Sequence, residues 1–367
     1  MRYIKQLDSI RAIAVILVLI WHWLPKTSFL NTFRTGPFGV TIFFVLSGFL
    51  ITKILLDNRN DAERLNNSKG TVLKSFYSRR ILRIFPAYYL TVFLTLLLHR
   101  KLGLSFPFPE FLSSITYTSD FYVFELKKWP QLTPHFWSLS VEEQFYLIWP
   151  LIILFIPKKY LIHSMVVFVS IGIISQFFVQ DPEFGYLLPH TCFDSLGMGA
   201  ILSWIVVYKP HLLNKTYKLL SLLALVGLVM IILDLAGIKF FYEWRVIYSI
   251  IGAWVISYVI HFKNKQNKLS FLLDNKFLIN IGKISYGIYL YHVLYFYLAW
   301  GRMAGFYYSH LSSIDSRIFP YLFFIINIWV LFFICWLSWR FIEKPFLGLK
   351  KYFKYPADDK IGILPVP

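Results

Sequence analysis

Ionisable side chains lie inside apolar runs of this sequence, where they are costly and therefore mark candidate functional sites. The first such run, RAIAVILVLIWH, contains Arg11 and His22. Their separation makes about three helical turns, so they share one helix face about 16 Å apart along the axis. A neutral imidazole in a low-dielectric site can act as a general base. The pair predicts a catalytic His22 assisted by Arg11, although an interfacial anchor and a packed histidine explain each residue alone equally well.

A second basic group opens the third apolar run as RRILRIFPAYY. Arg80 and Arg83 are one turn apart on a helix and face the same way. Arginine grips phosphate through forked hydrogen bonds, so this pair predicts a phosphate site at the mouth of a helical bundle. The alternative is a basic anchor at the membrane surface, and for Arg79 we prefer that alternative.

Two further polar groups lie in FWSLSVEEQFYLIW and KISYGIYLYHVLYF. Adjacent residues of a helix point about 100° apart, so Glu142 and Glu143 cannot both face one cavity, and we favour Glu143. The two carboxylates are also explained as partners of the helix dipole in a first turn. His292 either lines a polar pocket or belongs to an aromatic belt at the membrane interface, and its depth within its run favours the pocket.

Composition indicates the elements that must position these side chains. Of the 367 residues, 57% are hydrophobic and 15% are charged, whereas a soluble domain carries about a quarter charged residues. Many apolar runs approach the roughly 20 residues that cross a bilayer as a helix. We therefore predict an all-α, polytopic integral membrane protein with about ten transmembrane helices. The predicted spans are 10–28, 36–56, 81–99, 136–156, 161–180, 186–207, 217–236, 242–262, 278–299 and 318–342.

Net charge and cysteine content further narrow the class of protein and the partners it can have. The net charge of +18 would suggest nucleic acid in a soluble protein, but here most basic residues lie in short loops on one side of the predicted spans. Positive-inside bias explains that placement, puts both termini in the cytoplasm and leaves no nucleic-acid partner. Cys192 and Cys335 lie in apolar runs and predict neither a disulfide framework nor a metal site. The first run is expected to remain as a span, and the loop 100–135 to cap the outer face.

Several segments together resemble the membrane-bound acyltransferase-3 family, which includes O-antigen, exopolysaccharide and Nod-factor O-acetyltransferases. The matching segments, in family order, are QLDSIRAIAVILVLIWH, FGVTIFFVLSGFLIT, RRILRIFPAYY, FWSLSVEEQFYLIWP, SYGIYLYH and RFIEKPF. The resemblance implies a transmembrane acyltransferase domain over 1–347, followed by a short basic cytoplasmic tail over 348–367. It also implies a multi-pass protein of the bacterial inner membrane, and no SGNH esterase-like domain is expected after the last span.

The resemblance implies transfer of an acetyl group from cytoplasmic acetyl-CoA to a carbohydrate hydroxyl at the outer side of the membrane. Arg11 and His22 match the family's Arg-x10-His pair, and Arg80 and Arg83 match its Arg-x-x-Arg pair. Acetyl-CoA is then the acyl-donor substrate and no metal is involved. The partners are membrane lipids and a polysaccharide or lipid-linked glycan.

In the scheme that follows, Arg80 and Arg83 bind the phosphates of acetyl-CoA, and His22 either deprotonates the acceptor or carries the acetyl group. Glu143 assists the reaction. The acceptor pocket is predicted to be formed by His292, Trp137, Tyr146 and Ser140. The main alternative is a transporter or flippase for a sugar or lipid-linked saccharide that uses the same charges as a substrate path. A membrane anchor without chemistry is disfavoured because it leaves Arg11 and His22 on one face unexplained.

Overall fold

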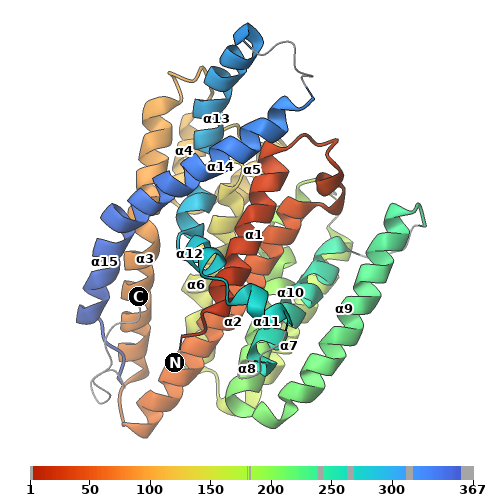
Figure 1. The fold of residues 1–367 in the computed structure, drawn as a ribbon. Coiled ribbons are helices and arrows are strands. Elements are labelled where there is room, and N and C mark those ends of the chain that lie inside the picture. The colour runs from red at the N-terminus through yellow and green to blue at the C-terminus, as the bar shows by residue number, and fades with distance from the viewer. Residues whose placement is uncertain are drawn as a thin grey trace.

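A computed structural model describes residues 3–179, 181, 183–238, 243–262, 268–310 and 317–356 of the chain. Within these ranges the structure contains helices and no strands (Figure 1). Ten of the helices are long, and each overlaps one predicted span. They are α1 Gln6–Trp23, α2 Thr35–Arg64, α3 Lys69–Leu98, α6 Phe136–Phe155, α7 Lys158–Phe178, α8 Phe193–Tyr208, α9 Leu213–Leu235, α10 Trp244–His261, α13 Ser285–His310 and α14 Phe319–Ser338.

Shorter elements connect the long helices. The short α-helices are α4 Phe108–Ile115, α5 Ser119–Leu126, α11 Lys268–Leu273, α12 Lys276–Lys283 and α15 Lys344–Gly348. A π-helical turn, η5 Trp339–Glu343, joins α14 to α15. The 3-10 turns are η1 Phe29–Phe33, η2 Gly185–Leu187, η3 Pro189–Cys192, η4 Pro210–Leu212 and η6 Leu349–Tyr352.

The lengths and surfaces of the long helices are those of a multi-pass membrane protein. Within the described ranges, nine helices are long and apolar enough to cross a membrane. The tenth long helix, α13, has 26 residues but is less apolar, because it carries several tyrosines and His292. Helices α7 and α9 expose large aliphatic side chains, such as Val167 and Ile232. An exposed apolar surface of this kind is suited to lipid rather than to water.

Helix α2 lies at the centre of the bundle and packs against α1, α6, α8 and α10. Its crossing with α8 depends on two glycines. A Cβ atom at Gly48 would collide with the carbonyl oxygen of Leu196, and one at Gly199 would collide with that of Val45. Small residues at helix crossings let two backbones approach closely in a membrane. Gly48 and Gly199 are therefore packing residues at the crossing of α2 and α8.

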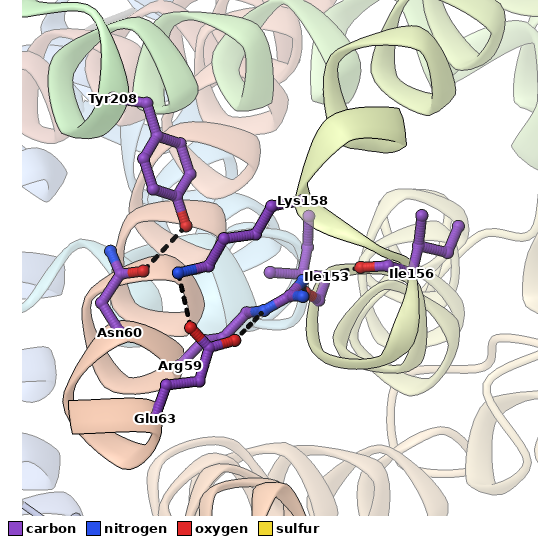
Figure 2. Close-up of polar contacts among 7 residues, drawn as sticks. All are labelled: Arg59, Asn60, Glu63, Ile153, Ile156, Lys158 and Tyr208. Atoms are coloured by element: carbon purple, nitrogen blue, oxygen red, sulfur yellow. Dashed lines mark hydrogen bonds and ion pairs between the residues drawn. The ribbon is translucent and has the colours of Figure 1, made fainter. Parts of the chain in front are cut away.

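At one end of the bundle, α2 is fastened to α6 and α7 by a buried arginine (Figure 2). Arg59 is 3% exposed, and its Nη1 donates to the carbonyl oxygens of Ile153 at 2.6 Å and Ile156 at 2.8 Å. Its Nε donates to Glu63 at 3.1 Å, and Glu63 also pairs with Lys158 at 2.5 Å. The guanidinium thus satisfies the carbonyls at the end of α6, which have no partner within their own helix.

Arg59→Ala is expected to destabilise the folded protein by about 1.5–3 kcal/mol, because charge-assisted hydrogen bonds to buried carbonyls are lost. The change is measured as a lower midpoint of thermal unfolding in detergent. Arg64→Ala is the matched control, because Arg64 lies on the same helix with a side chain that is 68% exposed. Equal midpoints for the two variants would contradict the role given to Arg59.

The loop predicted to cap the bundle does so with α4 and α5, which pack at the end of α3 and the start of α6. Tyr88 of α3 donates to the carbonyl of Ser114 at 2.7 Å, and the Ser119 backbone N–H donates to Ser140 of α6 at 3.1 Å. The opposite end of the bundle carries the start of α1 and the turn between α2 and α3 (Figure 1). We call these two ends the α4–α5 end and the α2–α3 end.

Candidate active site

Three histidines from distant parts of the chain meet near the α4–α5 end of the bundle. His22 comes from the last turn of α1, His292 from α13, and His135 directly precedes α6. The ring centroids of His22 and His292 are 4.8 Å apart, and those of His292 and His135 are 4.7 Å apart. His292 and His135 are 0% and 2% exposed, whereas His22 is partly exposed. We call these three residues the histidine cluster.

Contacts with backbone carbonyls assign the tautomers of the pair His22 and His292. Nδ1 of His292 lies 2.7 Å from the Tyr289 carbonyl oxygen, so this nitrogen carries the proton and donates it. Nε2 of His292 then bears a lone pair, and it lies 3.2 Å from Nδ1 of His22. Nδ1 of His22 also lies 3.0 Å from the Val18 carbonyl, so it too is a donor. The lone pair of His22 is therefore on Nε2, which forms no hydrogen bond to any described residue.

A carboxylate and two hydroxyls lie deeper in the bundle. Ser47 of α2 donates to Glu142 at 2.5 Å and lies 3.0 Å from the hydroxyl of Tyr146. The Arg80 guanidinium stands 5.2 Å from the centre of the Tyr146 ring. The neighbouring Glu143, which the sequence favoured for the cavity, points toward the aromatic group of Tyr88, Tyr117 and Tyr286 and makes no hydrogen bond to a described residue. Glu142, rather than Glu143, is thus the carboxylate joined to the predicted polar residues.

Arg11 lies closer to the α2–α3 end than His22, and the two side chains are not in contact. Its Nη1 donates to Asp8 at 2.6 Å, and Asp8 also accepts a hydrogen bond from Tyr3. Arg83 lies close enough to Arg11 and Arg80 for their positive charges to repel one another. Arg11 and His22 thus lie in the same helix, α1, but they contact different partners and do not form a pair.

Arg80 and Arg83 are half-buried, and within the described ranges neither forms a hydrogen bond or an ion pair. Arg80 stacks on the rings of Phe76 and Tyr146, at 5.6 Å and 5.2 Å. Their forked donors are therefore open to an external acceptor. Half-buried guanidinium groups without a protein acceptor favour an anionic ligand at this level of the bundle.

The other predicted pocket residues are used in packing. Ser140 is fully buried, donates to the Phe136 carbonyl at 3.1 Å and accepts from the Ser119 backbone N–H. The Trp137 ring is 6% exposed and lies 5.6 Å from the ring of Tyr186. These contacts place Ser140 beneath the start of α5 and Trp137 against the η2 turn that carries Tyr186.

Sequence reasoning missed His135 and Ser47 as members of the site, and it ranked Glu143 above Glu142. His135 was overlooked because it lies just before the predicted span 136–156, so it was not counted among the ionisable residues buried in the membrane. Ser47 lies in a run of apolar residues without charge. The signal that could have found His135 is its position at the start of α6, directly before the segment that holds the two glutamates. Among the described residues, no group of three or more His, Cys, Asp or Glu is arranged to hold a metal ion.

Two buried carboxylates in the α4–α5 cap, outside the long helices, have raised pKa values. Burial raises the pKa of Glu110 from 4.5 to about 7, while the hydrogen bond from Thr133 opposes the change. Burial also raises the pKa of Asp120 to about 6, and the hydrogen bond from Gln144 opposes it. Because the folded state binds these protons more tightly than the unfolded chain, the stability of the cap is highest at low pH and falls as pH rises.

Glu110→Gln is expected to flatten the pH dependence of stability between about pH 4.5 and 7. In the parent protein the unfolded carboxyl ionises from about 4.5, while the folded one keeps its proton up to about 7. The glutamine keeps the shape and cannot ionise. Thermal unfolding midpoints across this range measure the effect, with Glu125→Gln on the exposed side of α5 as the control. Identical slopes for Glu110→Gln and the parent protein would contradict the assignment.

Long apolar helices around a histidine cluster and an arginine group define a multi-pass membrane protein with a buried polar site. The profile of the family described as Acyltransferase domain, Acyl_transf_3, matches residues 4–353. The chain therefore belongs to the acyltransferase-3 family.

Two relatives illustrate the similarity. "Putative O-acetyltransferase SACOL0978" of Staphylococcus aureus (strain COL) is 31% identical over 94% of this chain. O-acetyltransferase OatA of Staphylococcus aureus (strain NCTC 8325 / PS 47) is 28% identical over 96% of this chain. The matched region covers 58% of each relative, so the chain spans little more than half their length. No solved structure matches the chain.

Proposed function

We propose that the protein is an O-acetyltransferase that moves the acetyl group of acetyl-CoA to a hydroxyl of a carbohydrate acceptor. The observation that carries the proposal is the Nε2 lone pair of His22, which has no partner among the described residues, while Nδ1 of the same ring is held by His292 and the Val18 carbonyl. Family membership supports acyl transfer, and the names of the relatives support an O-linked acetyl product.

The donor is expected to enter at the α2–α3 end. Arg80 and Arg83 bind its phosphates there, and the pantetheine arm extends between α1, α3 and α6 toward His22. Arg11 and His22 are about 16 Å apart along α1 by helix geometry, a distance that an extended pantetheine arm can cover. Positive-inside bias assigns the α2–α3 end to the cytoplasm, which is the compartment that supplies acetyl-CoA. The carbohydrate then approaches from the α4–α5 end, at the outer side of the bacterial inner membrane.

In the chemical step, His22 Nε2 takes the proton of the acceptor hydroxyl as its oxygen attacks the thioester carbonyl. The new ester bond forms, the carbon–sulfur bond breaks, and the proton passes from His22 to the departing CoA sulfur. His292 is a positioning residue in this step. Its Nε2 lone pair accepts a hydrogen bond from the Nδ1–H of His22. This hydrogen bond keeps the basic lone pair of His22 on Nε2 and stabilises the imidazolium that forms. An aspartate plays the corresponding role in the serine protease triad.

The test is turnover by the purified chain in lipid nanodiscs. With radiolabelled acetyl-CoA and a mixture of bacterial cell-surface saccharides, label should appear in a saccharide as an ester that mild base removes, together with free CoA thiol. The same preparation is reconstituted in vesicles loaded with labelled saccharide. Saccharide movement without any binding or turnover of acetyl-CoA would overturn the proposal in favour of a transporter.

A further inference from the structure

The segment that follows α15 is folded back on α3 rather than hanging free. Ser75 of α3 donates to the carbonyl of Lys354 at 2.8 Å, and Arg79 Nε donates to the carbonyl of Phe353 at 2.6 Å. The Arg79 guanidinium also stands 4.4 Å from the centre of the Tyr355 ring. These contacts tie residues 349–355, which were predicted to begin a cytoplasmic tail, to the helix that carries Arg80 and Arg83. Residues 357–367 of that predicted tail lie outside the described ranges.

This attachment brings Lys350 close to the three arginines of α3, Arg79, Arg80 and Arg83. Lys350 is half-buried, and the charges that act on it are those of Arg83, Arg80 and Arg79, all of the same sign. Within the described ranges it forms no hydrogen bond and no ion pair with a carboxylate. Bringing a lysine out of water against three arginines is unfavourable unless an anion joins them.

The neighbouring lysines behave differently. Lys351 is exposed and lies over the ring of Tyr352 at 5.1 Å, and Lys344 is exposed and lies over Trp339 at 5.5 Å. Both are typical of basic residues that extend to the membrane surface. A general surplus of positive charge at this end explains Lys351 and Lys344, but it does not explain why Lys350 turns inward.

We propose that Lys350 is a third ligand of the donor phosphates and completes the site begun by Arg80 and Arg83. Arg79 is then a positioning residue, because it holds the segment that delivers Lys350. This inference rests on the proposed use of acetyl-CoA. A CoA donor carries a diphosphate and a separate 3′-phosphate, which offer more acceptor oxygens and negative charge than two arginines satisfy. The group that Lys350 binds is a phosphate, which either the CoA donor or the headgroup of an anionic lipid can supply.

The experiment measures acetyl-CoA affinity by calorimetry for the full chain in nanodiscs of phosphatidylcholine. Lys350→Gln is expected to raise the Kd about tenfold, as for loss of one charge-assisted contact to phosphate. Lys350→Arg should restore most of the affinity, because it keeps the charge. Lys351→Gln, one residue away and exposed, should bind like the parent protein. Thermal unfolding of each variant checks that the fold is intact.

Several results would overturn the inference. Equal Kd values for Lys350→Gln and Lys351→Gln would remove Lys350 from the phosphate site. A loss that Lys350→Arg does not restore would make Lys350 a packing residue. A loss that appears only in nanodiscs containing phosphatidylglycerol would assign the lysine to a lipid headgroup. Failure of the parent protein to bind acetyl-CoA would instead overturn the proposed function, so the two failures are distinguishable.

Discussion

His22→Ala is expected to lower kcat for acetyl transfer by about 10²–10⁴-fold and to leave acetyl-CoA affinity unchanged. The reason is that His22 Nε2 bears a lone pair with no partner among the described residues, and His22 is the partly exposed member of the histidine cluster. The residues assigned to the donor phosphates lie further along the bundle. Initial rates of CoA release in the presence of acceptor measure kcat, and calorimetry measures the Kd for acetyl-CoA.

The control for this change is His163→Ala, which removes an exposed histidine from a long helix. It should leave kcat within about twofold, as expected for a surface change away from the site. A comparable loss of kcat in both variants, or a His22→Ala protein that still turns over at the parent rate, would remove His22 from the chemistry.

His292 provides a graded version of the same experiment. His292→Phe removes the acceptor that faces Nδ1 of His22, whereas His292→Gln can still present an amide oxygen to it. We expect the phenylalanine variant to lose more kcat than the glutamine variant, and the pH profile of kcat to shift in the phenylalanine variant. A packing role for His292 predicts equal losses and an unchanged pH profile.

Much of the architecture could be predicted from the sequence, because a bilayer imposes a strong length and polarity rule on each helix. All ten predicted spans overlap long helices, and the glycine-containing sixth span forms α8. The presence of Arg11 and His22 in one long helix, α1, could also be predicted from the sequence. The partner of His22 could not be predicted, because His292 comes from α13, far away in the sequence. The partner of Arg11 is local, since Asp8 lies one turn away in α1.

The two glutamates show the same limit in a single dipeptide. Helix geometry predicts that Glu142 and Glu143 point in different directions, and the structure agrees. Which of them meets polar partners depends on where α2 places Ser47 and where α3 places Tyr88, and both helices lie far from α6 in sequence. Periodicity within one helix carries no information on those neighbours. The directions of the two glutamate side chains could therefore be predicted, but the residues that contact each of them could not.

Arg80 and Arg83 have carboxylates nearby but no hydrogen-bonded acceptor among the described residues. The charge of Arg80 acts on Glu142 and Glu143, and that of Arg83 acts on Glu343. Asp8 accepts a hydrogen bond from Arg11, and Glu142 accepts one from the Ser47 hydroxyl, and neither carboxylate is hydrogen-bonded to Arg80 or Arg83. The two guanidinium groups keep their hydrogen-bond donors free while they repel each other and Arg11. An anion that accepts hydrogen bonds from both guanidinium groups would satisfy these donors.

Arg83→Gln and Arg80→Gln are therefore each expected to raise the KM for acetyl-CoA by about 10- to 100-fold, with a small change in kcat and in acceptor KM. Arg→Lys at either position should recover part of the affinity, because it keeps the charge but loses the forked geometry. Arg64→Gln is the control, since Arg64 is exposed on α2 and pairs with Asp61. If the acetyl-CoA and acceptor constants changed equally, the arginines would be supporting the bundle rather than holding phosphate, and the unsatisfied donors would need another anion to explain them.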